Sequence, residues 1–166
     1  MARILVVDDE PDIRHIIRIV LEGEGHEVTE ADDGLTAYEV AREQRVDLVL
    51  LDAMMPGMDG YQLLDKLLGL DDFVAPVVMV TGRSDAEGMY MEMDGGAIDH
   101  ISKPFTTEEM RDTVSRMLAL SPEAREERRN MLSRSAATHA AMEELRGLVR
   151  DDEKKTYPPG RFGLSR

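Results

Sequence analysis

The strongest constraint on the fold is a regular alternation, along residues 1–120, between short apolar runs and segments with helical periodicity. In the periodic segments, apolar residues recur at spacings of three and four, whereas the short runs are rich in Val, Ile and Leu. The short runs predict strands at residues 3–8, 26–31, 46–52, 77–81 and 97–102. The periodic segments predict helices at residues 11–23, 35–45, 60–69, 84–94 and 106–120.

This order predicts an α/β fold with a doubly wound parallel sheet, because strands that alternate with helices are joined by right-handed crossovers. The first, third and fourth strands are continuously apolar, which is typical of strands covered on both faces. The second and fifth are shorter or more polar and are expected at the edges. The predicted strand order is therefore 2-1-3-4-5, the flavodoxin-like arrangement, with its ligand crevice at the carboxyl ends of the strands.

Two apolar stripes are expected to fix the first and last helices of this body on the sheet. The inward residues are predicted to be Ile13, Ile16, Ile17, Val20 and Leu21 in the first helix, and Met110, Val114, Met117 and Leu118 in the last.

Charge divides the chain into an acidic body and a nearly neutral tail. The whole chain carries a formal charge of −14, and residues 1–120 alone carry −16, so the boundary falls near Ser121. An acidic body repels nucleic acid, and direct nucleic-acid binding is not expected. There is no Cys, no signal-peptide pattern and no apolar run approaching the roughly 20 residues of a membrane span, so we predict a cytoplasmic protein without membrane insertion.

The segment after residue 120 is predicted to be a helical extension over residues 121–150, followed by a flexible tail over residues 151–166. Ser121 suits the N-cap of a new helix and Pro122 its first turn. The tail contains a Pro-Pro-Gly sequence and has no periodicity, which is typical of mobile segments.

Polar residues follow the predicted strand ends in a consistent way. The first strand ends in Asp8 and Asp9, Asp52 ends the third, Thr81 ends the fourth, and Lys103 follows the fifth. A single acid at a strand end is usually a helix cap or a solvated turn residue. Five such residues in this order are expected to meet in one crevice, where three carboxylates would repel one another without a cation. Hard oxygen ligands favour Mg²⁺, and a carboxylate beside it can act as a nucleophile toward phosphorus.

Four segments of the chain resemble the receiver domains of two-component response regulators, a superfamily of CheY-like proteins. They are ILVVDDEPDIR, DLVLLDAMMPGMDG, VVMVTG and ISKPF, and the resemblance covers residues 2–120. It implies that Asp52 is the phosphoacceptor. It also implies that Asp8, Asp9 and Asp52, with the backbone carbonyl of Met54, hold the Mg²⁺ ion.

The resemblance further implies that Thr81 and Lys103 contact the phosphoryl group and that the Lys103–Pro104 peptide bond is cis. The family's switch aromatic corresponds to His100 here, which raises the hypothesis of a pH-sensitive switch, since histidine changes charge near neutral pH. Met54 and Arg83 stand where the family tunes phosphoryl lifetime, and shielding by Met54 predicts slow loss of the phosphoryl group, over minutes or more. The methionine-rich segment 89–93 is either core filler or a partner surface.

The implied function is that of a response regulator in a phosphorelay, not an enzyme. A sensor histidine kinase would be its phosphoryl donor, and an unknown downstream protein would bind the face formed by the fourth helix, fifth strand and fifth helix. The expectation is a stand-alone module without a DNA-binding output domain, and the extension is compatible with a homodimer.

Three alternatives remain open at this point. A Mg²⁺-dependent phosphohydrolase with an aspartyl nucleophile would want an acid two residues after it, where Met54 stands. A flavodoxin-like electron carrier would want a hydroxyl-rich phosphate loop in place of Asp8-Asp9-Glu10. A binding module that acts without phosphorylation is the third. His139 is interpreted as an exposed helical residue, not a phosphotransfer histidine.

Overall fold

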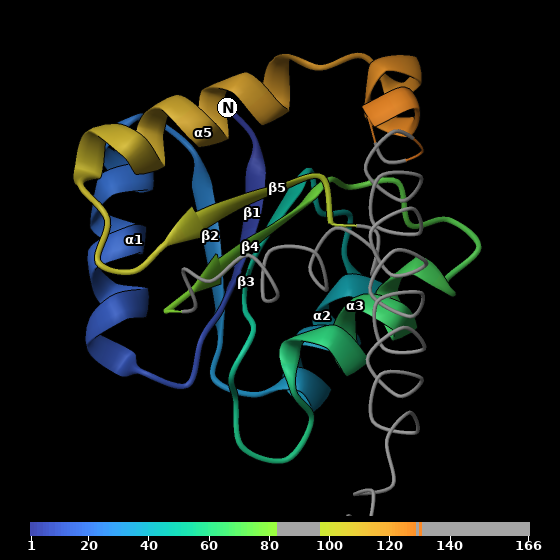
Figure 1. Ribbon diagram of the computed structural model, residues 1–166, viewed down its shortest axis with the longest axis horizontal. Coiled ribbons are helices and arrows are strands. Elements are labelled where there is room, and N and C mark those ends of the chain that lie inside the picture. Colours follow the sequence, from blue (N-terminus) through green and yellow to red (C-terminus); the bar gives the residue numbers. More distant parts are fainter. Residues whose placement is uncertain (83–96, 129, 131–166) are drawn as a thin grey trace, which may run out of the picture.

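The computed structural model describes residues 1–82, 97–128 and 130. In this part of the chain, five strands form one parallel sheet in the order β2-β1-β3-β4-β5 (Figure 1). The strands are Arg3–Val7 (β1), Glu27–Ala31 (β2), Leu48–Asp52 (β3), Val77–Thr81 (β4) and Asp99–Ser102 (β5). The predicted fold class and strand order are confirmed.

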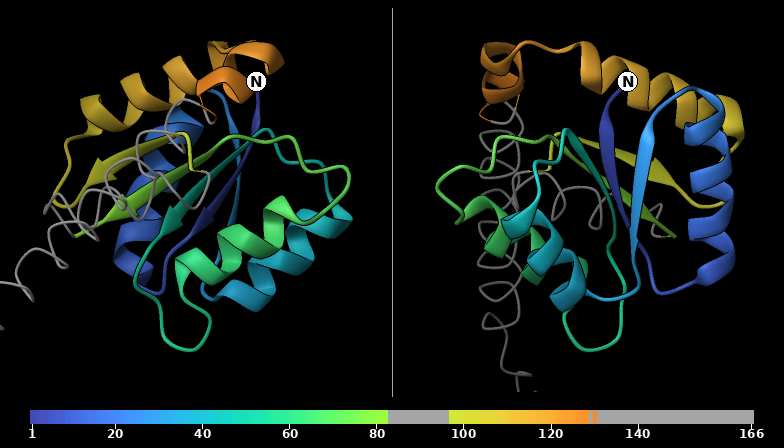
Figure 2. Two further views of the ribbon diagram at one scale, coloured as in Figure 1. Left: turned by 45° about the vertical axis from the view of Figure 1, so that its right-hand side comes forward. Right: turned by 180° about the vertical axis from the view of Figure 1, so that it is seen from behind.

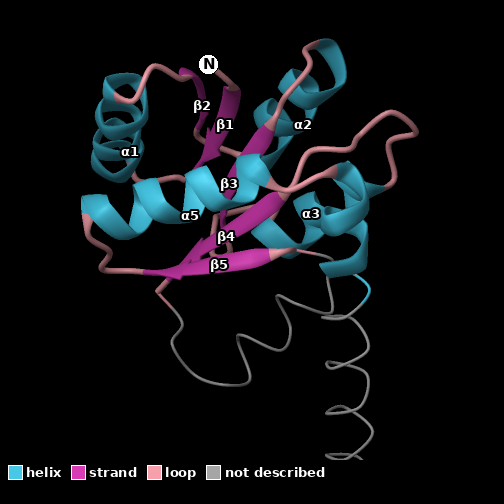
Figure 3. Cartoon of the chain, turned by 90° about the horizontal axis from the view of Figure 1, so that it is seen from above, coloured by secondary structure: helices cyan, strands magenta, loops and turns pink. Residues whose placement is uncertain are grey.

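Helices cover both faces of the sheet (Figure 2). Their bounds are Pro11–Gly23 (α1), Gly34–Glu43 (α2), Gly60–Leu68 (α3) and Thr107–Ala119 (α5). Helices α1 and α5 pack on one face, and α2 and α3 pack on the other. Seen from above, the twisted sheet runs between these two pairs (Figure 3). The predicted helix at 84–94, Arg83, the segment 89–93 and His139 lie outside the described residues.

The two faces of the core follow from the alternation of side chains along each central strand. In β1, Ile4 and Val6 face α1 and α5, whereas Leu5 and Val7 face α2 and α3. The same alternation repeats in β3 and β4, and every one of these apolar side chains is at most 1% exposed. This burial explains why the first, third and fourth apolar runs are continuous.

Three of the helices have a short polar residue at the N-cap, the position just before the first helical residue. Asp33 accepts the backbone N–H of Thr36 at the start of α2, and this contact lowers the pKa of Asp33. Asp59 and Thr106 each form a reciprocal capping box at the starts of α3 and α5. Such caps satisfy N–H groups that have no partner within the helix, so the sequence defines these helix starts locally.

Several boundaries differ from the prediction by one or two residues, and at the starts of β3 and β5 the reason is that burial extends beyond the strand ladder. Val46 is partly buried against the core although β3 begins at Leu48. Ala97 and Ile98 are fully buried, yet β5 begins only at Asp99. The Ile98 N–H still donates to the Val77 carbonyl oxygen of β4 at 2.9 Å. Apolar character reports that a residue is covered, and it does not report the residue at which a regular strand begins.

The predicted stripes are correct at their centres and fail at their margins. Ile17, Val20 and Leu21 are buried in α1, whereas Ile16 is 46% exposed. In α5, Met110, Val114 and Met117 are buried, while Leu118 is only partly buried. The helix turns by about 100° per residue, so Ile16, one position before Ile17, lies at the margin of the buried face.

A second helical segment follows α5, with residues 122–128 in helical conformation. The Ser121 hydroxyl oxygen accepts the backbone N–H of Ala124 at 3.1 Å, which is the predicted N-cap. The structure describes nothing of residues 131–166, so the predicted extent of the extension to residue 150 and the flexible tail stay predictions. Within the described ranges, no helix has the length and apolar character needed to cross a membrane.

Candidate functional site

The carboxyl ends of neighbouring strands bring the predicted acids together. Asp8 follows β1 directly, and Asp52 is the last residue of β3. Carboxylate oxygens of Asp8, Asp9 and Asp52 all lie within 4.8 Å of one another. Asp8 is 1% exposed and Asp52 is 4% exposed, whereas Asp9 is exposed. The crevice therefore holds two buried carboxylates and one that faces solvent.

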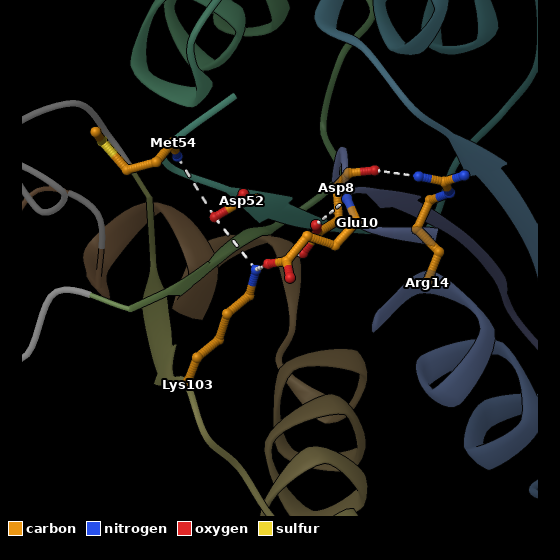
Figure 4. Close-up of polar contacts among 6 residues, drawn as sticks. All are labelled: Asp8, Glu10, Arg14, Asp52, Met54 and Lys103. Carbon is orange, nitrogen blue, oxygen red and sulfur yellow. Dashed lines mark hydrogen bonds and ion pairs between the residues drawn. The ribbon is translucent and has the colours of Figure 1, made fainter. Parts of the chain in front are cut away.

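Lys103 is the residue after β5, and its side chain extends into the same crevice (Figure 4). Its ammonium nitrogen lies 2.7 Å from Asp8 Oδ2, 3.3 Å from Glu10 Oε1 and 3.6 Å from Asp52 Oδ1. Burial lowers the pKa of Lys103, but the carboxylates of Asp8, Asp52 and Glu10 raise it more, so it stands above its ordinary value. Lys103 is therefore a fixed positive charge at neutral pH.

The carboxyl group of Asp52 is harder to ionise than an ordinary aspartate. Burial is the largest cause, and together with the charges of Asp8 and Asp9 it raises the pKa of Asp52 to about 6. The Lys103 charge and the Met54 N–H oppose this increase without cancelling it. One ammonium group thus leaves the negative charge of the crevice only partly balanced.

The backbone around Asp8 is held by several hydrogen bonds. Its N–H donates to the Ala31 carbonyl at 3.2 Å, and its Oδ1 accepts the Glu10 N–H at 2.9 Å. Arg14 of α1 donates from its guanidinium to the Asp8 carbonyl oxygen at 2.6 Å. Sequence reasoning missed these roles of Glu10 and Arg14, although both lie in the segment ILVVDDEPDIR that carries the resemblance.

Gly60 lets the start of α3 approach the end of β3. Its N–H donates to the Ala53 carbonyl at 3.0 Å, and a Cβ at this position would collide with the Asp52 carbonyl oxygen. Only glycine lacks the atom that would collide. Gly60 is therefore a positioning residue for Asp52 that sequence reasoning did not single out, although it ends the segment DLVLLDAMMPGMDG.

Thr81 and His100 lie on the two strands that follow β3 in the sheet. Thr81 ends β4, is fully buried, and its carbonyl oxygen accepts the Lys103 N–H at 2.7 Å. The peptide bond from Lys103 to Pro104 is cis, as the resemblance implied. His100 is half-buried in β5, opposite Met79 of β4. Its proposed switch role stays a prediction.

Met54 contacts the site through its backbone. Its N–H donates to Asp52 Oδ1 at 3.4 Å, whereas its side chain is directed away from that carboxylate (Figure 4). The residue is 60% exposed. The predicted shielding of a phosphoryl group by this side chain would therefore require a different rotamer, and the slow loss of the phosphoryl group stays a prediction.

The donor set fits a hard divalent cation. Asp8 Oδ2 is buried, and the donor that lies beside it in the described part of the chain is the Lys103 ammonium, at 2.7 Å. Asp52 Oδ1 has only distant donors, the Met54 N–H at 3.4 Å and the Lys103 ammonium at 3.6 Å, so it can accept a closer ligand. Carboxylate oxygens with few donors, gathered around one point, are the ligands that Mg²⁺ prefers.

Comparison with known proteins agrees with this geometry. Residues 4–115 match the family described as the response regulator receiver domain. The DNA-binding response regulator MtrA of Mycolicibacterium smegmatis is 40% identical over 131 residues, which cover 79% of this chain and 55% of that protein. Sporulation initiation phosphotransferase F of Bacillus subtilis is 36% identical over 118 residues, covering 71% of this chain and 94% of that protein. The chain thus spans about half the length of the first relative and nearly all of the second.

Solved structures show the same fold. Chemotaxis protein CheY4 of Vibrio cholerae superposes with a TM-score of 0.67 at 30% identity, covering 70% of this chain and 98% of that one. The receiver domain of a Pseudomonas aeruginosa sensor histidine kinase, solved with magnesium coordinated in its active site cleft, has a TM-score of 0.68 at 27% identity, covering 72% and 98%. With the family match and the acidic crevice, these similarities establish that the chain belongs to the receiver domain family of two-component response regulators.

Proposed function

We propose that this protein accepts a phosphoryl group on Asp52 from a sensor histidine kinase, with Mg²⁺ bound in the same crevice. The observation that carries the proposal is the pairing of a nearly buried Asp52 carboxylate with the Lys103 ammonium, 3.6 Å away, beside two further acids. This arrangement supplies a nucleophile, a fixed cation and oxygen ligands within one small volume. Each is a component that phosphoryl transfer requires.

In the proposed reaction, an Asp52 carboxylate oxygen forms a bond to phosphorus while the bond from phosphorus to the kinase histidine nitrogen breaks. The Met54 N–H holds the Asp52 carboxylate from one side. Lys103 offsets the negative charge on the phosphoryl oxygens, and the Thr81 hydroxyl is their expected hydrogen-bond donor. Asp8, Asp9, Asp52 and the Met54 carbonyl oxygen would hold Mg²⁺, which supplies further neutralisation of phosphoryl charge when bound.

The output is proposed to be a change in protein binding. Phosphorylation adds negative charge and acceptor oxygens at one end of β5, and a partner that prefers the altered surface would shift the population toward it. The relatives support a regulatory role but differ in kind, because one is described as a DNA-binding regulator and another as a phosphotransferase. The kinase, the downstream protein, self-association and the cytoplasmic location therefore stay predictions, as does the expectation that the protein is no enzyme.

Intact-mass spectrometry after incubation with acetyl phosphate, with and without Mg²⁺, tests the proposal. The expected result is one phosphoryl adduct that requires Mg²⁺, is absent in Asp52→Asn, and persists in Asp65→Asn, which removes an exposed acid of α3. A folded wild-type protein that gains no adduct would refute the proposal and favour a module that binds without phosphorylation. Sustained release of inorganic phosphate without an adduct would instead favour a phosphohydrolase.

A further inference from the structure

The segment that follows α5 folds back onto the beginning of β5. The Arg128 Nε donates to the Ile98 carbonyl oxygen at 2.7 Å, and an Arg128 terminal nitrogen lies 3.4 Å from Asp99 Oδ2. These contacts join residues 29 and 30 positions apart in the sequence. In Figure 1 the segment (orange) lies past the end of α5, on the side where β5 begins. One guanidinium group therefore fastens residues 121–128 to the edge strand.

Asp99 is the centre of this attachment. Its Oδ2 also accepts from Arg116 of α5 at 2.9 Å, and its Oδ1 accepts the His100 N–H at 2.9 Å. The Asp99 side chain is only 13% exposed, so solvent screens these contacts less than it would on an open surface. The same carboxylate thus contacts the extension, α5 and the backbone of β5.

The attachment and the acidic crevice lie at opposite ends of one short strand. β5 contains Asp99–Ser102, and Lys103 follows immediately. Four residues of strand span roughly 13 Å. Within the described ranges, β5 is an edge strand that pairs only with β4. A displacement of β5 that accompanied a reorientation of Lys103 would disturb pairing with β4 alone, but it would also have to move Asp99 relative to Arg116 and Arg128.

We propose that residues 121–128 act as an intramolecular ligand of the β5 edge that favours the position of β5 in which Lys103 pairs with Asp8 and Glu10. This regulation rests on the proposed function, because the attachment would raise the free energy needed to move Lys103 from Asp8 and Glu10 toward a phosphoryl group. Coupling between two sites is reciprocal. Loss of the attachment strengthens binding of a phosphoryl mimic, and binding of the mimic loosens the segment.

The test uses the full chain and titrates beryllofluoride, a phosphoryl mimic, in the presence of Mg²⁺, with amide resonances of β4 and β5 as the readout. Arg128→Ala is expected to bind the mimic about threefold more tightly or better, within the usual range for coupling by residues distant from a ligand. Arg128→Lys should behave similarly, because an ammonium cannot reproduce the two directed contacts of a guanidinium. Arg111→Ala is the matched control and should bind the mimic like wild type, since the Arg111 guanidinium pairs with Glu24 at 3.0 Å and contacts neither β5 nor residues 121–128.

Hydrogen exchange supplies the reciprocal measurement. Amides of residues 122–128 should exchange faster in Arg128→Ala than in wild type, and faster in wild type when the mimic is bound. Equal affinities for the mimic in wild type and both Arg128 variants, with the segment released, would overturn the inference while leaving the proposed function intact. Unchanged exchange in Arg128→Ala would overturn it as well. Wild-type protein that binds neither beryllofluoride nor a phosphoryl group would instead defeat the proposed function, and the inference with it.

Discussion

The two ends of β5 carry side chains of opposite charge, and their surroundings balance that charge to different degrees. At its carboxyl end, the Lys103 ammonium faces the carboxylates of Asp8, Glu10 and Asp52. At its amino end, the Asp99 carboxylate faces the guanidinium groups of Arg116 and Arg128. At the first end one ammonium faces three carboxylates, whereas at the second end two guanidinium groups face one carboxylate and leave none of its negative charge uncompensated. An end whose charge is unbalanced is suited to take up a cation and a phosphoryl group, and an end balanced internally is suited to hold structure.

The largest effect should come from disturbing the backbone that carries the unbalanced end. Gly60→Ala forces a Cβ against the Asp52 carbonyl oxygen, so we expect a loss of about 2–4 kcal/mol in the free energy of unfolding. Phosphoryl uptake from acetyl phosphate should also fall sharply. Urea denaturation measures the first effect, and Gly69→Ala is its control, because a Cβ there would meet only ordinary contacts at 3.5 Å. Equal stability of the two variants would contradict the close approach.

Removal of the Lys103 ammonium, the cation at the unbalanced end, should have the second-largest effect on the free energy of unfolding. Lys103→Met leaves Asp8 and Asp52 without their ammonium partner, and we expect a loss of about 1–3 kcal/mol at pH 7.5 without divalent ions. Lys66→Met, which removes an ammonium from α3, should change the free energy of unfolding by less than about 0.5 kcal/mol. A Lys103→Met protein as stable as wild type would show that the crevice needs no internal cation.

Asp52→Asn should stabilise the protein when no divalent cation is present. The pKa of Asp52 is raised from 3.8 to about 6, so the folded protein binds the extra proton more tightly than the unfolded chain does. Folding stability therefore falls as the pH rises from about 4 to 6, and the penalty is fully present above that window. With allowance for screening by solvent, Asp52→Asn should gain about 1–2 kcal/mol at pH 7.5.

The same variant should gain little at pH 4, where Asp52 is largely protonated in the folded protein. Thermal unfolding at pH 4, 6 and 7.5 measures this dependence, with Asp65→Asn as the exposed control. A constant difference between wild type and Asp52→Asn across these values would show that the Asp52 carboxylate carries no excess charge penalty.

The smallest effect is expected at the balanced end. Asp99→Asn keeps the shape of the side chain but removes its charge, so the contacts with Arg116 and Arg128 weaken. We expect a loss of about 0.5–1 kcal/mol that shrinks in 1 M salt, because ion pairs with partly exposed partners are screened. Chemical denaturation at low and high salt checks this, and a loss as large as that of Lys103→Met would erase the distinction between the two ends.

Local features of the sequence were sufficient for the order of the elements, the fold class and the positions of the acids at strand ends. Apolar runs without polar interruption identified the central strands, and the residues Asp33, Asp59 and Thr106 cap their helices through contacts within four residues. Such signals involve only neighbouring residues, so they can be recognised in the sequence without knowledge of the tertiary structure. The same reasoning placed Ile16 inward and extended β3 to Val46, because periodicity reports an average direction and not the exact margin of a buried face.

Contacts between residues far apart in the chain were decided only by the tertiary structure. The sequence determined that Asp8, Asp52 and Lys103 stand at strand ends, and thus that they meet at one edge of a parallel sheet. Folding alone decided that Lys103 pairs most closely with Asp8, that Gly60 must lack a side chain, and that Arg128 reaches Asp99 and Ile98. The reason is that these contacts depend on the distances between packed elements, which no pattern along the chain records.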